Sequence, residues 1–267
     1  KPSDEVDHTP QIWRDNPELW VEERLGETLW SAQRLALRTL RDHRKTAVAS
    51  CHGVGKSWLA ARAIAWWLDT HDPGDAFVVT TAPSQAQIRG VLWVREIART
   101  KAAGNLPGRL NQTEWWWPIV DAKTGRTREE IVAFGRKPQD YDATSFQGIH
   151  APFVLIVGDE ACGLLPSLID AMSTLASNDT SKMLLLGNPD DPASEFATAC
   201  APGSGYATIH ISAFETPNFT GEPIPARVAR SLVGRIYVED FRRKWAPSWR
   251  WVDATGAPAT PETGVRV

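Results

Sequence analysis

The stretch Ser50-Cys51-His52-Gly53-Val54-Gly55-Lys56-Ser57 joins two segments of different character. Residues 46–49 before it form a short apolar run, and residues 58–68 after it carry apolar side chains at helical spacing with no glycine or proline. A strand, a glycine-bearing turn, Gly-Lys-Ser and a helix is the order in which a phosphate-binding loop occurs. The glycines let backbone N–H groups point inward, and the helix adds the positive end of its dipole. We therefore predict nucleotide-binding residues at Ser50, Cys51, His52, Gly53, Val54, Gly55, Lys56, Ser57 and Trp58.

Lys56 and Ser57 carry the chemistry of this loop. The lysine supplies a positive charge for the β- and γ-phosphates, and the serine hydroxyl can ligate Mg²⁺. Ser50 departs from the usual signature, which has glycine at the first position. The alternative is a glycine turn that precedes an ordinary helix, with Lys56 in solvent.

Composition indicates a globular protein. The chain has 267 residues, of which 42% are hydrophobic and 23% charged, so it can bury a substantial core. No apolar run approaches the roughly 20 residues that cross a membrane. Three widely spaced cysteines fit neither a disulfide framework nor a metal cluster, and they favour a reducing, intracellular compartment. The net charge of -3 does not exclude nucleic acid, because a local basic face is sufficient.

Polar side chains follow two further apolar runs. Asp159 and Glu160 come directly after residues 153–158, and Asn188 follows residues 182–187. In an α/β sheet, ligands bind at the carboxyl ends of the strands, where the phosphate loop also lies. Asp159 is then placed to hold Mg²⁺, Glu160 to orient and deprotonate the attacking water, and Asn188 to contact the γ-phosphate or that water. The alternative is an ordinary polar end of each strand.

The succession of elements predicts an α/β fold. Strands at 46–50, 76–81, 153–158, 182–187 and 207–212 alternate with helices, which indicates a mainly parallel sheet of at least five strands flanked by helices. A strand between the phosphate-loop strand and the acidic strand is typical of the P-loop NTPases of the ASCE type, which carry a catalytic glutamate. Helices within 226–245 predict a small lid.

The predicted division has four parts. Residues 1–12 form a flexible lead-in, 13–215 the ATPase core, 216–250 a lid or linker subdomain, and 251–267 a linker. Within the core, residues 104–130 read as an exposed insertion or hairpin.

Two further groups of residues have two readings each. Trp30 and Gln33, just before the loop, either read the adenine of a nucleotide or are a core and a surface residue. Arg34, Arg38 and Arg41 form a basic stripe that is either a solvated helix face or a DNA contact. Lys123, Arg126 and Arg128 are further candidates for contacting DNA.

Six motifs occur in a fixed order: Trp30-x-x-Gln33, S-C-H-G-V-G-K-S, T-A-P-S-Q, S-F-Q-G-I-H-A, V-L-I-V-G-D-E-A and L-L-L-G-N-P. Together they resemble the ATPase domain of the large terminase subunit of tailed double-stranded DNA bacteriophages, over residues 13–250. The resemblance implies a motor that hydrolyses ATP with Mg²⁺ and pumps double-stranded DNA through a portal into a procapsid. It also implies that Lys56 and Ser57 bind phosphate and Mg²⁺, that Asp159 is the Mg²⁺ carboxylate and Glu160 the catalytic one, and that Gly187-Asn188-Pro189 couples the site to motion.

The same resemblance implies partners. These are double-stranded DNA, the portal protein, the small terminase subunit and further copies of the chain in a ring, commonly a pentamer, with a monomer in isolation. The location would be the cytoplasm of the infected bacterial host.

The chain departs from the family pattern at three places. His52 and Gln147 stand where many terminases have arginine, so the arginine finger supplied in trans falls to Arg136 or Arg89. No aspartate cluster of the family's C-terminal nuclease occurs, so nuclease activity is not expected and 251–267 would lead toward that domain. Two other functions stay open, a helicase-like DNA translocase and a non-catalytic nucleotide-binding module.

Overall fold

The computed structural model describes residues 9–121, 123–137, 151–246, 248–253, 255–261 and 265–266. The chain divides into two compact units, the first comprising residues 1–49 and 56–210 and the second residues 50–55 and 211–267. The second unit begins close to the predicted lid boundary at 216. It also includes the phosphate loop, which no sequence signal indicated.

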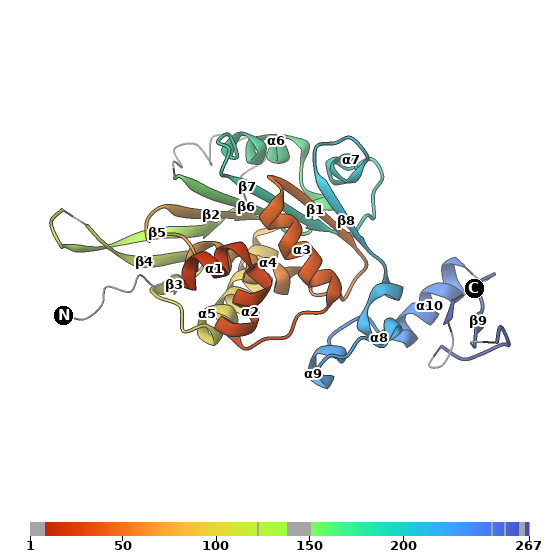
Figure 1. Cartoon of the computed structure of the whole chain (residues 1–267). Coiled ribbons are helices and arrows are strands. Elements are labelled where there is room, and N and C mark those ends of the chain that lie inside the picture. The colour runs from red at the N-terminus through yellow and green to blue at the C-terminus, as the bar shows by residue number, and fades with distance from the viewer. Residues whose placement is uncertain are drawn as a thin grey trace. The chain divides into compact units, whose positions relative to one another are not determined.

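An eight-stranded sheet has the order β3-β4-β5-β2-β6-β7-β1-β8 (Figure 1). Its strands are β1 (Lys45–Ser50), β2 (Ala76–Thr81), β3 (Arg109–Asn111), β4 (Glu114–Val120), β5 (Thr127–Gly135), β6 (Phe153–Gly158), β7 (Lys182–Gly187) and β8 (Ala207–Ile211). The neighbours from β5 through β2, β6 and β7 to β1 pair in parallel, whereas β3, β4 and β5 pair antiparallel. The predicted mainly parallel α/β sheet is confirmed. β7 lies between β1 and β6, an order typical of P-loop NTPases of the ASCE type.

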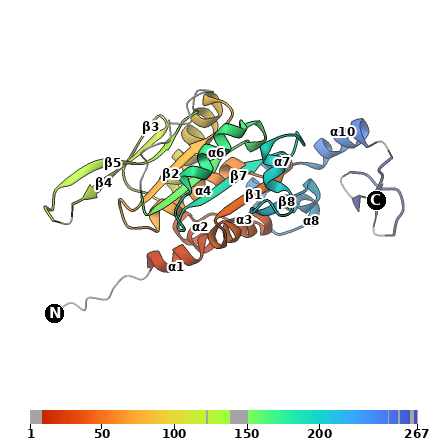
Figure 2. The ribbon, with the colours of Figure 1, turned by 90° about the horizontal axis from the view of Figure 1, so that it is seen from above.

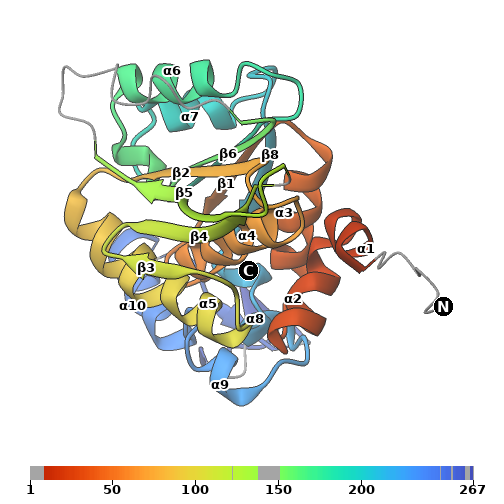
Figure 3. The same cartoon turned by 90° about the vertical axis from the view of Figure 1, so that its left-hand side faces the viewer.

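Helices cover both faces of the sheet in the first unit. Figure 3 shows α6 and α7 on one face and α3, α4 and α5 on the other. The helical elements of this unit are α1 (Thr9–Asp15), α2 (Pro17–Leu25), α3 (Ser31–Asp42), α4 (Lys56–Asp69), the π-helix η1 (Gln87–Ile97), α5 (Ala98–Ala103), the 3₁₀ turn η3 (Ala161–Gly163), α6 (Pro166–Leu175) and α7 (Glu195–Cys200). None of the helices in the described ranges is long and apolar enough to cross a membrane.

Helix α4 is central because every residue from Leu59 to Leu68 is buried. One of these is Arg62, whose guanidinium donates to Glu27 and Glu96 and lies 4.1 Å from the centre of the Trp58 ring. A buried guanidinium needs such partners, since an unpaired charge in the interior would be strongly destabilising. The two carboxylates thus allow the helix that follows the phosphate loop to be enclosed on all sides.

Two details of the first unit were not foreseen from the sequence. The lead-in to residue 12 is not loose throughout, because α1 already begins at Thr9. The helical segment after β2 is a π-helix followed by the short α5, a change of register that apolar spacing does not reveal.

The hairpin prediction for residues 104–130 was right, but the segment is less exposed than expected. β4 and β5 form an antiparallel pair that extends beyond the rest of the sheet (Figure 2). Trp115 and Trp117 are buried on one side of β4, whereas Trp116 is half-buried on the other, where Arg109 lies 4.9 Å from its ring centre. Alternation along the strand explains why three consecutive tryptophans do not share one face.

The second unit is built around short helices. It contains η4 (Ala213–Glu215), α8 (Pro217–Thr220), α9 (Ala226–Ala229) and α10 (Arg235–Trp245), followed by the antiparallel pair β9 (Trp251–Val252) and β10 (Val265–Arg266). The helices predicted within 226–245 are confirmed as α9 and α10, whereas the expected linker after residue 250 includes paired strands.

An apolar cluster and one buried carboxylate hold the second unit together. Val233, Val238 and Trp251 form the buried centre of the cluster. Glu239 accepts hydrogen bonds from Arg242, Arg243 and the Trp251 indole, and the bond from Arg242 is the main reason that its pKa is lowered to about 2.

Candidate functional site

Three neighbouring strands bring the predicted side chains to one edge of the sheet. β1 leads through loop 50–55 into α4, whose first residues are Lys56 and Ser57. β6 is followed by Asp159 and Glu160, and β7 by Asn188. Because β1, β7 and β6 run parallel, their carboxyl ends meet at the same edge.

Hydrogen bonds join these side chains in two pairs. The Lys56 Nζ donates to the Asn188 Oδ1, and the Ser57 Oγ donates to the Asp159 Oδ2 over 2.7 Å. The backbone N–H of Glu160 donates to the Asp159 Oδ1 over 3.1 Å. Lys56, Asp159 and Asn188 are 8%, 4% and 3% exposed, so both pairs are largely shielded from water. The ammonium of Lys56 is also near enough to the carboxylate of Asp159 for its charge to lower the pKa of that group.

Glu160 occupies an unusual backbone conformation. Its φ of 52° and ψ of 47° lie in the left-handed region, where a non-glycine residue is strained, and η3 follows immediately. The half-buried Glu160 is thereby turned sharply out of the line of β6. Strain of this kind persists only where surrounding structure enforces it, and it gathers at functional sites.

Close packing at Gly187 helps to hold the turn after Glu160 in place. A Cβ on Gly187 would lie 3.1 Å from the Ala161 nitrogen, 3.2 Å from the Cys162 nitrogen and 2.9 Å from a ring carbon of Phe196. Only glycine lets the end of β7 approach the turn after Glu160 so closely. The sequence placed this residue in a motif but did not indicate the contact.

Burial perturbs the acid–base chemistry of Asp159. Loss of solvent raises its pKa to about 6, and the hydrogen bond from Ser57 opposes that rise. The charge of Glu160 raises it further, and the Glu160 N–H and the Lys56 ammonium lower it. The buried Asp159 carboxylate and the Ser57 hydroxyl, 2.7 Å apart, are both hard oxygen ligands, the type that Mg²⁺ prefers. These two residues fit a Mg²⁺ ion that takes its other ligands from water and substrate phosphate.

We expect Asp159→Asn to stabilise the ligand-free protein at neutral pH. The folded-state pKa of Asp159 is raised from 3.8 to about 6, so the penalty for its charge is complete above pH 6 and vanishes below about pH 4. A shift of this size corresponds to roughly 3 kcal/mol in the free energy of unfolding. Denaturant unfolding of both proteins at pH 7 and pH 4 measures it. An equal difference at the two pH values would contradict the assignment to burial of the charge.

The phosphate loop has the backbone that its glycines predicted. Gly53 and Gly55 have φ values of 69° and 86°. The departure at Ser50 is accommodated, because the described non-glycine residues with positive φ are Asn105, Gln112 and Glu160. Ser50 is buried at the end of β1 and needs no glycine conformation. His52 is exposed, Cys51 is half-buried and Val54 is buried.

The residues proposed to read adenine are buried. Trp30 is fully buried, which agrees with its alternative reading as a core residue, and Gln33 is 5% exposed rather than on the surface. The Gln33 Oε1 accepts a hydrogen bond from the backbone N–H of Trp30 over 3.4 Å. Their contact with a nucleotide stays a prediction.

Both candidate arginine fingers reach solvent. Arg89 on η1 and Arg136 after β5 are exposed, and the Arg136 guanidinium lies 4.7 Å from the centre of the Phe134 ring. Exposure is what a residue acting on a neighbouring subunit requires, and the role itself stays a prediction. Gln147 and the rest of the stretch 138–150 lie outside the described residues.

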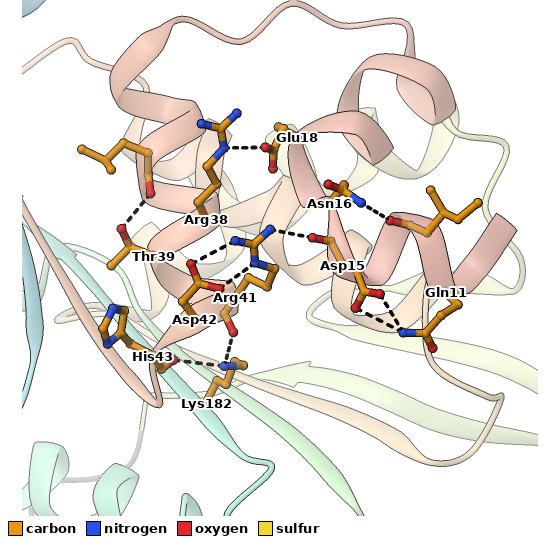
Figure 4. A network of polar contacts seen from close by, with 12 residues as sticks. Gln11, Asp15, Asn16, Glu18, Arg38, Thr39, Arg41, Asp42, His43 and Lys182 are labelled. Carbon is orange, nitrogen blue, oxygen red and sulfur yellow. Dashed lines mark hydrogen bonds and ion pairs between the residues drawn. The ribbon is translucent and has the colours of Figure 1, made fainter. Parts of the chain in front are cut away.

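The basic stripe is paired with acids. Arg38 bonds to Glu18 of α2, and Arg41 bonds to Asp42 and to the Asp15 carbonyl (Figure 4). Arg34 bonds to Glu22, also on α2. These contacts give the three arginines a structural role between α3 and the preceding helices. Their contact with DNA stays a prediction.

Comparison with known proteins gives matches at the level of structure. No protein-family model matches the sequence, and no curated protein is similar to it. The large terminase ATPase domain of Thermus phage P74-26 superposes with a TM-score of 0.54 at 14% identity, covering 87% of this chain and 94% of that one. The large terminase of a thermophilic bacteriophage superposes with a TM-score of 0.53 at 14% identity, covering 82% of this chain and 51% of that one.

The latter terminase in complex with ADP gives a TM-score of 0.51 at 14% identity, covering 81% of this chain and 50% of that one. The chain thus spans nearly all of an isolated terminase ATPase domain and about half of a longer large terminase. The protein has the fold of the ATPase domain of phage large terminases, a P-loop NTPase fold.

Proposed function

We propose that the chain is the ATPase motor domain of a viral DNA-packaging terminase, which hydrolyses ATP with Mg²⁺ to translocate double-stranded DNA into a procapsid. The observation that carries the proposal is that two hydrogen-bonded pairs, Lys56 with Asn188 and Ser57 with Asp159, lie at the carboxyl edge of a terminase-like sheet, with Glu160 next to Asp159. A terminase of this fold was solved in complex with ADP, which supports a nucleotide as the ligand.

The residues of this edge suit phosphoryl transfer. Lys56 would leave Asn188 and neutralise the β- and γ-phosphates, while Ser57 and Asp159 would hold Mg²⁺. The bound Mg²⁺ supplies charge neutralisation at the phosphate oxygens. Glu160 would orient the attacking water and accept its proton, and Asn188 would hydrogen-bond to that water or to the γ-phosphate.

Assembly completes the proposed motor. Further copies of the chain would form a ring, with the portal protein, the small terminase subunit and double-stranded DNA as partners, in the cytoplasm of the infected bacterial host. Arg136 or Arg89 would enter the site of the neighbouring copy, and hydrolysis by the isolated domain would be slow without it.

Phosphate release with and without Mg²⁺ and DNA tests the proposal. We expect turnover that depends on Mg²⁺, is abolished by chelation and rises with double-stranded DNA and the assembled partners. ATP binding with no phosphate release under any of these conditions would favour the non-catalytic module. Strand separation during turnover would instead favour the helicase-like translocase.

Two groups of basic residues are candidates for contacting DNA in this motor. Lys123 and Arg126 are exposed at the turn of the β4–β5 hairpin, whereas Arg34 and Arg38 are occupied by carboxylates of α2. We expect the pair Lys123→Ala and Arg126→Ala to lower DNA stimulation of turnover several-fold and to reduce its dependence on salt, because each phosphate contact releases counterions. The matched pair Arg34→Ala and Arg38→Ala should lower the thermal stability more. If DNA stimulation fell more in the Arg34→Ala and Arg38→Ala variant than in the hairpin variant, the basic stripe on α3 would be the DNA contact instead.

A further inference from the structure

The phosphate loop is in direct backbone contact with a C-terminal segment of the second unit. The Val233 N–H donates to the Gly53 carbonyl over 2.8 Å. A Cβ on Gly53 would lie 3.2 Å from the Val233 nitrogen and 3.4 Å from its Cα. With a φ of 69°, Gly53 satisfies both the turn of the loop and this close approach. The loop conformation and the contact with Val233 therefore depend on the same glycine.

Val233 is itself firmly held. It is 6% exposed in the apolar cluster with Val238 and Trp251, and Cys51 of the loop packs against the same cluster. Its carbonyl accepts a hydrogen bond from the Asn218 Nδ2 over 3.0 Å. Both polar groups of the Val233 backbone are therefore engaged, one with the phosphate loop and one with α8.

The bond to Gly53 also sets the direction of the next amide. In a trans peptide the carbonyl and the following N–H point in opposite directions. When the Gly53 carbonyl faces Val233, the Val54 N–H must face away from it. The Cys51 N–H, by contrast, donates to the Ile211 carbonyl over 3.0 Å and is not available to a phosphate. These two bonds, both within the second unit, thus fix the directions of the Cys51 and Val54 N–H groups.

We propose that Val233 is a positioning residue for the phosphate loop, so that docking of the segment around it onto Gly53 sets the affinity for the triphosphate. The inference rests on the proposed nucleotide-binding function and adds its control by the segment around Val233, which belongs to the same unit as the loop. The coupling is reciprocal: nucleotide binding strengthens the contact between Gly53 and Val233 by the same factor that the contact strengthens binding.

The variant Val233→Pro removes the donating N–H, and Val233→Ala keeps it while shortening the side chain. ATPγS titration by calorimetry in the presence of Mg²⁺ compares the two with the unaltered protein. We expect Val233→Pro to weaken binding about tenfold, which corresponds to about 1.4 kcal/mol, and Val233→Ala to weaken it less than about threefold. Equal affinities for the proline and alanine variants would overturn the inference, because the N–H would then have no influence on the loop.

Hydrogen exchange on the unaltered protein provides a second test that does not depend on the folding of a variant. Saturating ATPγS should slow exchange of the Val233 amide, whereas amides of the hairpin strand β4 should exchange as before. An unchanged rate at Val233 would overturn the inference. Failure of the unaltered protein to bind ATPγS would refute the proposed function itself, whereas binding without protection of Val233 refutes the coupling alone.

Discussion

Replacing Glu160 by glutamine is expected to lower kcat for ATP hydrolysis by about 10²–10⁴-fold and to leave ATP affinity within about threefold. The carboxamide has the size and shape of the carboxylate but cannot accept the proton of the attacking water. Binding is spared because the hydrogen bond of this residue to Asp159 comes from its backbone N–H, which glutamine retains. Single-turnover phosphate release together with a separate nucleotide titration measures both quantities.

A matched control is Glu129→Gln on the hairpin. Glu129 is exposed and pairs with Arg109, so its change alters the net charge of the chain equally without touching the sheet edge of β6. Turnover of this control should equal that of the unaltered protein. If Glu160→Gln hydrolyses ATP as fast as the control, Glu160 is not the catalytic carboxylate.

The sequence could predict those features that depend on residues close together in the chain. The apolar run before Ser50 and the helix after Lys56 identified β1 and α4, because glycines and an uninterrupted helical stripe are signals within one short window. Asp159 and Asn188 were found in the same way, since each directly follows a buried strand. Their convergence then follows from parallel pairing, which brings the carboxyl ends of strands to one edge.

Contacts between distant segments could not be predicted in this way. The stripe of Arg34, Arg38 and Arg41 was visible, but its carboxylate partners on α2 become apparent only when α2 and α3 pack together. The approach of Gly187 to the turn after Glu160 and the bond from Val233 to Gly53 likewise depend on tertiary packing. Backbone hydrogen bonds of this kind leave no periodicity in the chain, and neither does the left-handed conformation of Glu160.

Replacing Lys56 by alanine is expected to abolish detectable turnover and to weaken ATP binding by at least about tenfold. Among the described residues, the ammonium is the only positive side chain in the two hydrogen-bonded pairs, Lys56 with Asn188 and Ser57 with Asp159. At a shielded site a charge-assisted bond to phosphate contributes about 1.5–3 kcal/mol, which is roughly 10- to 150-fold in affinity. The variant should remain folded, because alanine is a good helix former at the start of α4 and leaves only the Asn188 Oδ1 without its donor. Nucleotide titration, turnover and thermal unfolding of the same preparation measure the three effects.

The variant Asn188→Ala distinguishes the effect of this residue on ATP affinity from its effect on turnover. In the ligand-free protein Lys56 is bonded to Asn188, and this bond must break before the ammonium can reach a phosphate. Removing the carboxamide therefore frees Lys56, so ATP affinity should stay equal or rise slightly even while turnover falls, because the water or γ-phosphate loses a hydrogen-bonding partner. Lys56→Arg is the complementary variant: it keeps the charge, but the larger planar guanidinium does not replace a compact, buried ammonium. Normal hydrolysis by Lys56→Ala, or full activity of Lys56→Arg, would mean that the phosphate does not bind at the start of α4.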